Sequence, residues 1–152
     1  MIKETNGDLL KTEGIDIICH QVNYCGIMGA GIAKQIKDQL LSKKQFEEYR
    51  KMCELFKEEN LGTVFSQELP DGRYVANMFS QNGMGGVATN YTAMKQCFQM
   101  VKGFAAPTGL TVGIPGYIGC GIAGGDWNIV KGIIENVFDD DAVDVVIVYF
   151  PK

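Results

Sequence analysis

Two glycine-rich segments carry the residue types best suited to chemistry in this 152-residue chain. Residues 26–33 read Gly-Ile-Met-Gly-Ala-Gly-Ile-Ala, and residues 116–126 read Gly-Tyr-Ile-Gly-Cys-Gly-Ile-Ala-Gly-Gly-Asp. Because such residues carry little side chain, backbone N–H groups can approach phosphate oxygens closely, and a helix that starts there adds its dipole. Two segments of this kind predict a site that grips a diphosphate from opposite sides, whereas a lone glycine pair would indicate only a tight turn.

Two familiar phosphate motifs do not fit the first segment. Gly26 and Gly31 have the separation of a P-loop, but Ile32 stands where the lysine must reach the phosphates. Residues 29–31 begin like the dinucleotide fingerprint, yet Lys34 occupies the position of the third glycine. Nucleotide triphosphate hydrolysis of the P-loop type and hydride transfer are therefore disfavoured.

Two residues beside these segments could move protons. His20 is the only histidine and precedes the first segment; a histidine pKa of about 6.5 suits proton transfer at neutral pH, although a lone histidine can equally be structural. Asp126 ends the second segment and could activate water, or it could cap the helix that starts at Trp127, worth about 1 kcal/mol. Cys25 and Cys120 have no partner base and are expected to be packing residues rather than nucleophiles.

Hydrophobic periodicity predicts the elements that position these residues. Apolar or β-branched runs predict strands at Ile15–Cys19, Gly62–Ser66, Tyr74–Phe79, Leu110–Ile114 and Asp144–Phe150, with a weaker one at Met1–Glu4. Helical spacing follows from Ile32 to Cys53, over Asn90–Val101 and after Asp126. The pattern predicts a three-layer α/β/α sandwich with a mixed, mostly parallel sheet, in one domain spanning residues 1–152. Both glycine segments then join a strand end to a helix start, where ligands bind in open sheets.

Composition narrows the class of protein. Hydrophobic residues make up 46% and charged residues 21%, which is ordinary for a globular protein. A net charge of −4 argues against a general nucleic-acid surface, which needs a basic stripe. Five cysteines without C-x-x-C spacing suit reduced thiols in the cytoplasm, and neither a metal nor a cofactor is expected. The sequence contains no apolar run long enough for a membrane span and no secretory signal.

Taken in order, several stretches resemble the macrodomain family. They are Gly7-Asp8-Leu9, residues 20–23, residues 28–33, residues 115–126 and Val148-Tyr149. The similarity runs from about Gly7 to Phe150 and is to the branch that contains ADP-ribose 1″-phosphate phosphatases and terminal ADP-ribose glycohydrolases. The resemblance implies the macrodomain fold and a site for ADP-ribose.

The resemblance also implies a role for each matching position. Asp8 would accept a hydrogen bond from the adenine amino group, Leu9 would offer its backbone N–H to the ring, and Asn23 would lie beside the distal ribose. Tyr149 or Phe150 would pack near the adenosine. The diphosphate would lie against Met28, Gly29, Ala30, Gly31, Ile32 and Ala33 on one side and Gly119, Cys120, Gly121, Ile122, Ala123 and Gly124 on the other.

Catalysis is where the sequence departs from the resemblance. Glycohydrolases of this branch use a lysine against the distal ribose, but Gln81 or Asn82 stands at that place here. Covalent catalysis by lysine is therefore not expected. By position, the resemblance implies His20 as a general acid or base and Asp126 as the residue that orients or activates water. The resulting hypothesis is a hydrolase, either a phosphatase or an ADP-ribosyl hydrolase, that acts at the distal ribose of ADP-ribose 1″-phosphate or of a related ADP-ribosyl adduct. An ADP-ribosylated macromolecule is among the partners considered. A binding module without turnover and, third, a nucleotide-dependent oxidoreductase are the alternatives.

Overall fold

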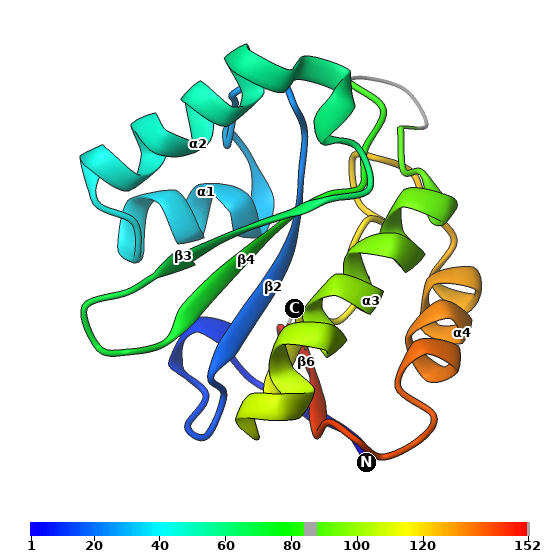
Figure 1. Cartoon of the computed structure of the whole chain (residues 1–152). Helices are drawn as coiled ribbons and strands as arrows, with labels where there is room; N and C mark the ends of the chain where they lie inside the picture. The colour runs from blue at the N-terminus through cyan, green and yellow to red at the C-terminus, as the bar shows by residue number, and fades with distance from the viewer. Residues whose placement is uncertain (84–87, 152) are drawn as a thin grey trace.

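The computed structural model of the chain describes residues 1–83 and 88–151 and arranges them in three layers, with one sheet between two pairs of helices (Figure 1). The strands are β1 (Ile2–Asn6), β2 (Ile17–Val22), β3 (Val64–Glu68), β4 (Tyr74–Phe79), β5 (Val112–Pro115) and β6 (Val145–Tyr149). They form a six-stranded sheet in the order β1-β6-β5-β2-β4-β3. All neighbours are parallel except β3 and β4, so the predicted mixed, mostly parallel sheet is confirmed.

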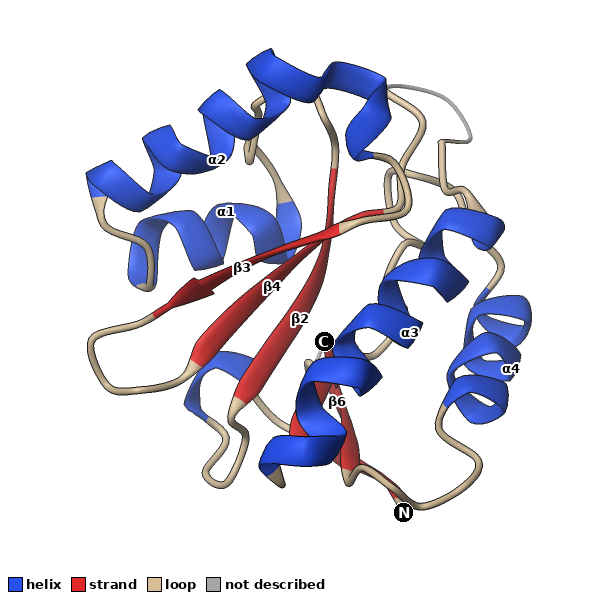
Figure 2. Ribbon diagram, viewed as in Figure 1, coloured by secondary structure: helices blue, strands red, loops and turns tan. Residues whose placement is uncertain are grey.

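Two helices cover each face of the sheet (Figure 2). Helices α1 (Gly31–Gln39) and α2 (Lys43–Phe56) lie on one face, and α3 (Tyr91–Thr108) and α4 (Trp127–Val137) lie on the other. Two short 3-10 helices, η1 (Leu9–Lys11) and η2 (Lys57–Asn60), complete the described elements. In the described parts of the chain no helix is long and apolar enough to cross a membrane.

Local capping explains where several helices begin and end. The side chain of Ser42 accepts from the Gln45 amide while the Gln45 side chain accepts from the Ser42 amide, which is a capping box. This capping box begins a new helix, so the helical stretch expected from Ile32 to Cys53 is split into α1 and α2. Helix α3 ends at Gly109, whose φ of 68° is the left-handed conformation that glycine adopts without strain.

The site is positioned by a divergence between β2 and β5. These parallel neighbours pair only at Ile17 with Val112 and at Ile18 with Gly113, whereas β2 pairs with β4 along its whole length. The chain leaves β2 toward the β4 side of the sheet and leaves β5 toward the β6 side. Such a reversal of strand order opens a crevice at the carboxyl ends of the strands, which is where α/β sheets bind ligands.

Candidate functional site

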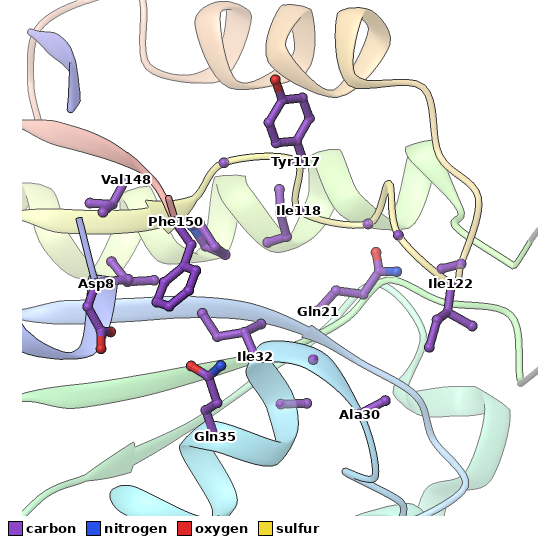
Figure 3. Close-up of a pocket in the computed structure, with 18 of the residues that line it drawn as sticks. Asp8, Gln21, Ala30, Ile32, Gln35, Tyr117, Ile118, Ile122, Val148 and Phe150 are labelled. Atoms are coloured by element: carbon purple, nitrogen blue, oxygen red, sulfur yellow. The ribbon is translucent and has the colours of Figure 1, made fainter. Parts of the chain in front are cut away.

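A cavity of about 380 Å³ occupies this crevice (Figure 3). Its walls come from β2, the start of α1, the residues after β5, and the segment after β6, together with η1 and the residues before it. The lining residues are Gly7, Asp8, Leu9, Gln21, Ala30, Gly31, Ile32, Ala33, Gln35, Gln81, Pro115, Gly116, Tyr117, Ile118, Gly119, Gly121, Ile122, Ala123, Val148 and Phe150. Asp8 carries the one carboxylate in this lining, and among the described residues no lysine, arginine or histidine contributes to it.

The start of α1 forms one wall of the cavity. Ala30 is the N-cap residue, and its side chain cannot cap the amides of the first turn. Gly31 has a φ of 59°, and a Cβ at this position would meet no heavy atom within 4 Å. The first-turn N–H groups of a helix lack intrahelical acceptors and carry partial positive charge, so this wall suits an anion without any cationic side chain.

The side chain of Asn23 holds the loop that leads into α1 by bonding to backbone groups of that loop. Asn23 donates through Nδ2 to the Ile27 carbonyl at 2.8 Å and accepts at Oδ1 from the Cys25 amide at 3.0 Å. From α2, the Tyr49 hydroxyl donates to the Asn23 carbonyl at 2.7 Å. Asn23 was expected beside the distal ribose, but its carboxamide is engaged inside the loop and it does not line the cavity.

The loop from Gly116 to Gly125 forms the facing wall. Within residues 1–83 and 88–151, the backbone amides of Gly119, Gly121, Ile122 and Ala123 find no acceptor. The carbonyl of Gly119 is held twice, by the Thr89 hydroxyl at 2.6 Å and by the Gly125 amide at 2.8 Å. Residues whose amides have no acceptor in the described chain therefore line two walls of the cavity, which is the arrangement expected for a diphosphate.

A carboxylate and an aromatic ring mark one end of the cavity. Asp8 caps η1 by accepting from the Leu10 amide at 3.0 Å, which engages Oδ1 and leaves Oδ2 without a partner in the described chain. Figure 3 shows Phe150 projecting over this end, with Asp8 on one side and Ile32 on the other. A flat ring with an amino group can stack on Phe150 and donate to Asp8, so both features suit an adenine.

Tyr149 does not reach this cavity. Alternate residues of a strand point to opposite faces, so Val148 and Phe150 line the cavity while Tyr149 faces the α4 side. There its ring packs against Gly116, where a Cβ would approach Tyr149 Cδ1 to 2.2 Å, and lies 6.0 Å from the Trp127 ring. Its hydroxyl donates to Glu4 at 2.6 Å. Of the two aromatic residues considered at the sequence level, Phe150 rather than Tyr149 has the position expected for adenosine packing.

His20 is sealed inside the protein, away from the cavity. The strand β2 runs on to Val22 instead of ending at Cys19, so His20 lies mid-strand opposite Asn77, with no exposed surface. Asn77 donates to the Phe65 carbonyl and to Gln67, which leaves its Oδ1 to accept from His20 Nε2 at 2.6 Å. Burial lowers the pKa of His20 to about 4, so the imidazole is neutral near pH 7. The expected position beside the phosphate loop is therefore wrong, and this geometry does not support His20 as an acid or base acting on a bound ligand.

Asp126 serves as a helix cap. Its side chain accepts from the Asn128 amide at 2.9 Å at the start of α4, and its own amide donates to the Tyr91 hydroxyl at 2.9 Å. The carboxylate is exposed and does not line the cavity. Asp126 therefore caps α4, which is one of the two roles that the sequence suggested, and its role in activating water stays a prediction.

The predicted ligand-binding residues separate into two groups. Those that line the cavity are Asp8, Leu9, Ala30, Gly31, Ile32, Ala33, Gly119, Gly121, Ile122 and Ala123. Those outside its lining are Asn23, Met28, Gly29, Cys120, Gly124 and Tyr149. Met28 is buried in the core beside α2, and Cys120 points its thiol toward the Ile118 carbonyl at 3.4 Å.

Three glutamines to which the sequence argument assigned no binding role line the cavity, although that argument named Gln81 at the place of the glycohydrolase lysine. Gln21 extends from β2, Gln81 follows β4, and Gln35 lies on α1 one turn after Ile32. A neutral side chain carries no pKa signal, and Gln21 was hidden because the strand was predicted to end too early. Within the described residues no group of three or more His, Cys, Asp and Glu side chains is placed to hold a metal ion.

The chain is similar in sequence and in fold to several known proteins. No family model matches the sequence. The chain is 28% identical over 138 residues to the ADP-ribose glycohydrolase OARD1 of Bos taurus, covering 91% of this chain and 84% of that protein. A Bacteroides thetaiotaomicron protein of unknown function superposes with a TM-score of 0.86 at 28% identity, covering 98% of both chains. The macrodomain of Mycobacterium tuberculosis DarG superposes with a TM-score of 0.83 at 22% identity, covering 100% of this chain and 99% of that one.

These matches establish the fold. The chain has the macrodomain fold, and the resemblance to this family that the sequence indicated is confirmed. The similarity to an ADP-ribose glycohydrolase extends over most of both sequences.

Proposed function

We propose that this chain binds ADP-ribose in the cavity between β2 and β5. The observation that carries the proposal is the pair of facing walls with unpaired backbone amides, from the start of α1 and from the loop at residues 116–125. In this proposal the diphosphate lies between the two walls. Asp8 and Leu9 bind the adenine, Phe150 packs on it, and the distal ribose extends toward Gln21. Residues 1–152 act as a single domain.

Calorimetric titration with ADP-ribose and ATP tests this proposal. We expect ADP-ribose to bind with a micromolar dissociation constant, about −8 kcal/mol, because the donors and the apolar slot are preformed. ATP should bind more weakly, since no cationic side chain lines the described cavity to balance a third phosphate. Equal affinity for the two ligands, or none for either, would contradict the assignment.

Hydrolysis at the distal ribose is a second candidate function. It is supported by the extended similarity to a protein named an ADP-ribose glycohydrolase. The proposed substrates are ADP-ribose 1″-phosphate and ADP-ribose attached to a macromolecule. Asp126 remains the candidate for orienting water because it is exposed and ends the second glycine-rich loop, whereas His20 is sealed.

Turnover separates the catalyst from the binding module. Purified protein is incubated with ADP-ribose 1″-phosphate and with an ADP-ribosylated protein, and released phosphate and ADP-ribose are measured. If Asp126 orients water, Asp126→Asn should slow release by ~10²-fold or more, while stability stays nearly constant because Asn also caps helices. Tight ADP-ribose binding with no release from either substrate would favour the binding module.

A further inference from the structure

Gln21 lies away from Asp8, toward the other end of the cavity (Figure 3), and belongs to a hydrogen-bonded network. At this end Gln21 accepts at Oε1 from the Ser80 hydroxyl at 2.8 Å and donates through Nε2 to Thr89 Oγ1 at 3.1 Å. The Thr89 hydroxyl gives its own proton to the Gly119 carbonyl at 2.6 Å, so it can only accept from Gln21. These bonds set which atom of the Gln21 carboxamide is oxygen and which is nitrogen.

The network joins four separate segments of the chain. Gln21 belongs to β2, Ser80 follows β4, Thr89 precedes α3, and Gly119 lies in the second glycine-rich loop. Gly119 leaves the space this network needs, because a Cβ there would lie 3.0 Å from Gln21 Oε1 and 3.1 Å from Thr89 Oγ1. Gln21 is therefore held rigidly at the cavity wall, which lowers the entropy cost of using it to bind a ligand.

The remaining hydrogen-bonding capacity at this end is neutral and of mixed kind. Gln81 Nε2 donates to the Gly83 carbonyl at 2.9 Å, and Gln81 Oε1 lies 3.4 Å from Gln21 Nε2. Within the described residues this leaves one N–H of Gln81 and one lone pair on each carboxamide oxygen. A sugar hydroxyl both donates and accepts, so it can satisfy such a wall, whereas an ionised phosphate only accepts and would face these lone pairs without a cation.

We propose that Gln21 is a specificity-determining residue that selects a neutral, hydroxyl-bearing sugar after the diphosphate, and that Thr89 positions it. This inference rests on the proposed function, because it assumes that the diphosphate lies between the two amide walls. It assigns discrimination at the distal end to a side chain, while the diphosphate itself is bound by backbone amides. Gln21 contributes to the affinity for ADP-ribose but not to that for ADP, which lacks the distal ribose.

Calorimetry with ADP-ribose and ADP on parent and Gln21→Met protein tests the assignment. Met has nearly the same length as Gln but cannot hydrogen-bond, so we expect ADP-ribose affinity to fall about tenfold while ADP affinity stays the same. Gln39→Met is the matched control, because Gln39 is exposed at the end of α1 and does not line the cavity. The control should retain the parental ratio of the two affinities.

Thr89 variants test the positioning role. Thr89→Val removes the hydroxyl and should lower the preference for ADP-ribose over ADP, whereas Thr89→Ser keeps the hydroxyl and should restore that preference. Should Gln21→Met fail to fold by circular dichroism, Gln81→Met provides the same comparison from the other carboxamide. An unchanged ratio of the two affinities in Gln21→Met, or an equal loss for both ligands in that variant, would overturn the inference alone. A parent protein that binds neither ligand would overturn the proposed function and this inference together.

Discussion

The two glycine-rich loops face the same cavity, but different parts of the molecule hold them in shape. The loop before α1 is organised by Asn23, a side chain within the loop, with one added bond from Tyr49 on α2. The loop after β5 has backbone bonds of its own, such as that from the Gly125 amide to the Gly119 carbonyl, and it is held in addition from outside by the Thr89 hydroxyl and by the Tyr149 ring packed on Gly116. A side chain within the first loop therefore shapes that loop, while contacts across the fold add to the shape of the second.

The largest expected effect comes from Gly31→Glu in the first loop. The new carboxylate would stand where backbone must approach a diphosphate, so ADP-ribose binding should fall below detection by calorimetry through clash and repulsion. Gly72→Glu is the matched control, because Gly72 has a similar positive φ of 88°, has open space at its Cβ and lies outside the cavity. A folded Gly31→Glu protein that binds like the parent would show that the first loop is only a turn.

A pH experiment tests whether His20, just before the first loop, belongs to the core rather than to the site. Burial lowers the pKa of His20 in the folded state to about 4, whereas its pKa in the unfolded chain is about 6.5. Between pH 6.5 and pH 4 the unfolded chain therefore binds a proton that the native state excludes. Through this group the free energy of unfolding is highest above pH 6.5 and falls by about 3 kcal/mol as the pH is lowered to 4. Urea unfolding at pH 7 and pH 4 should show a smaller loss in His20→Gln than in the parent.

The His20→Gln protein also has a binding prediction. ADP-ribose affinity at pH 7 should match that of the parent, since His20 does not line the cavity. Identical pH dependence of unfolding in parent and variant, or a large loss of ADP-ribose binding in the variant, would indicate that His20 belongs to the site rather than to the core.

The dependence of the second loop on distant contacts is tested by Gly116→Ala. The added methyl would approach Tyr149 Cδ1 to 2.2 Å, and the ring is enclosed by Tyr117 and Trp127. We expect a loss of about 1–3 kcal/mol in the free energy of unfolding and about tenfold weaker ADP-ribose binding. Gly132→Ala in α4, where a Cβ meets nothing within 4 Å, should instead stabilise the protein by up to about 1 kcal/mol. Equal behaviour of the two variants would mean that Tyr149 does not brace the loop.

The smallest expected effect tests the contact between the first loop and α2. Tyr49→Phe removes the hydroxyl bonded to the Asn23 carbonyl and should lower the free energy of unfolding by about 1 kcal/mol. ADP-ribose affinity should change by only about twofold, because Asn23 still organises the loop. Tyr74→Phe is the control, since its hydroxyl bond to Glu68 is exposed. A tenfold loss of binding in Tyr49→Phe would mean that the first loop also depends on tertiary contacts.

Local patterns in the sequence determined much of the architecture. The strand Tyr74–Phe79 has the predicted bounds because turn residues enclose a run that is apolar except for Asn77. The cap at Asp126 and the glycine-rich start of α1 could also be predicted from the sequence, because capping and close backbone approach depend on neighbours in sequence. These local features sufficed to place the two glycine-rich loops between strand ends and helix starts.

Tertiary structure decided which side chains actually reach the cavity. The strand β2 extends through His20 and Gln21 because β4 pairs with it to Val22, and this pairing buries His20 on one face while Gln21 lines the cavity. The same alternation after β6 sends Phe150 into the cavity and Tyr149 toward α4. Composition could not distinguish these neighbours, because the orientation of a strand residue is set by the length and register of pairing with strands far away in the sequence.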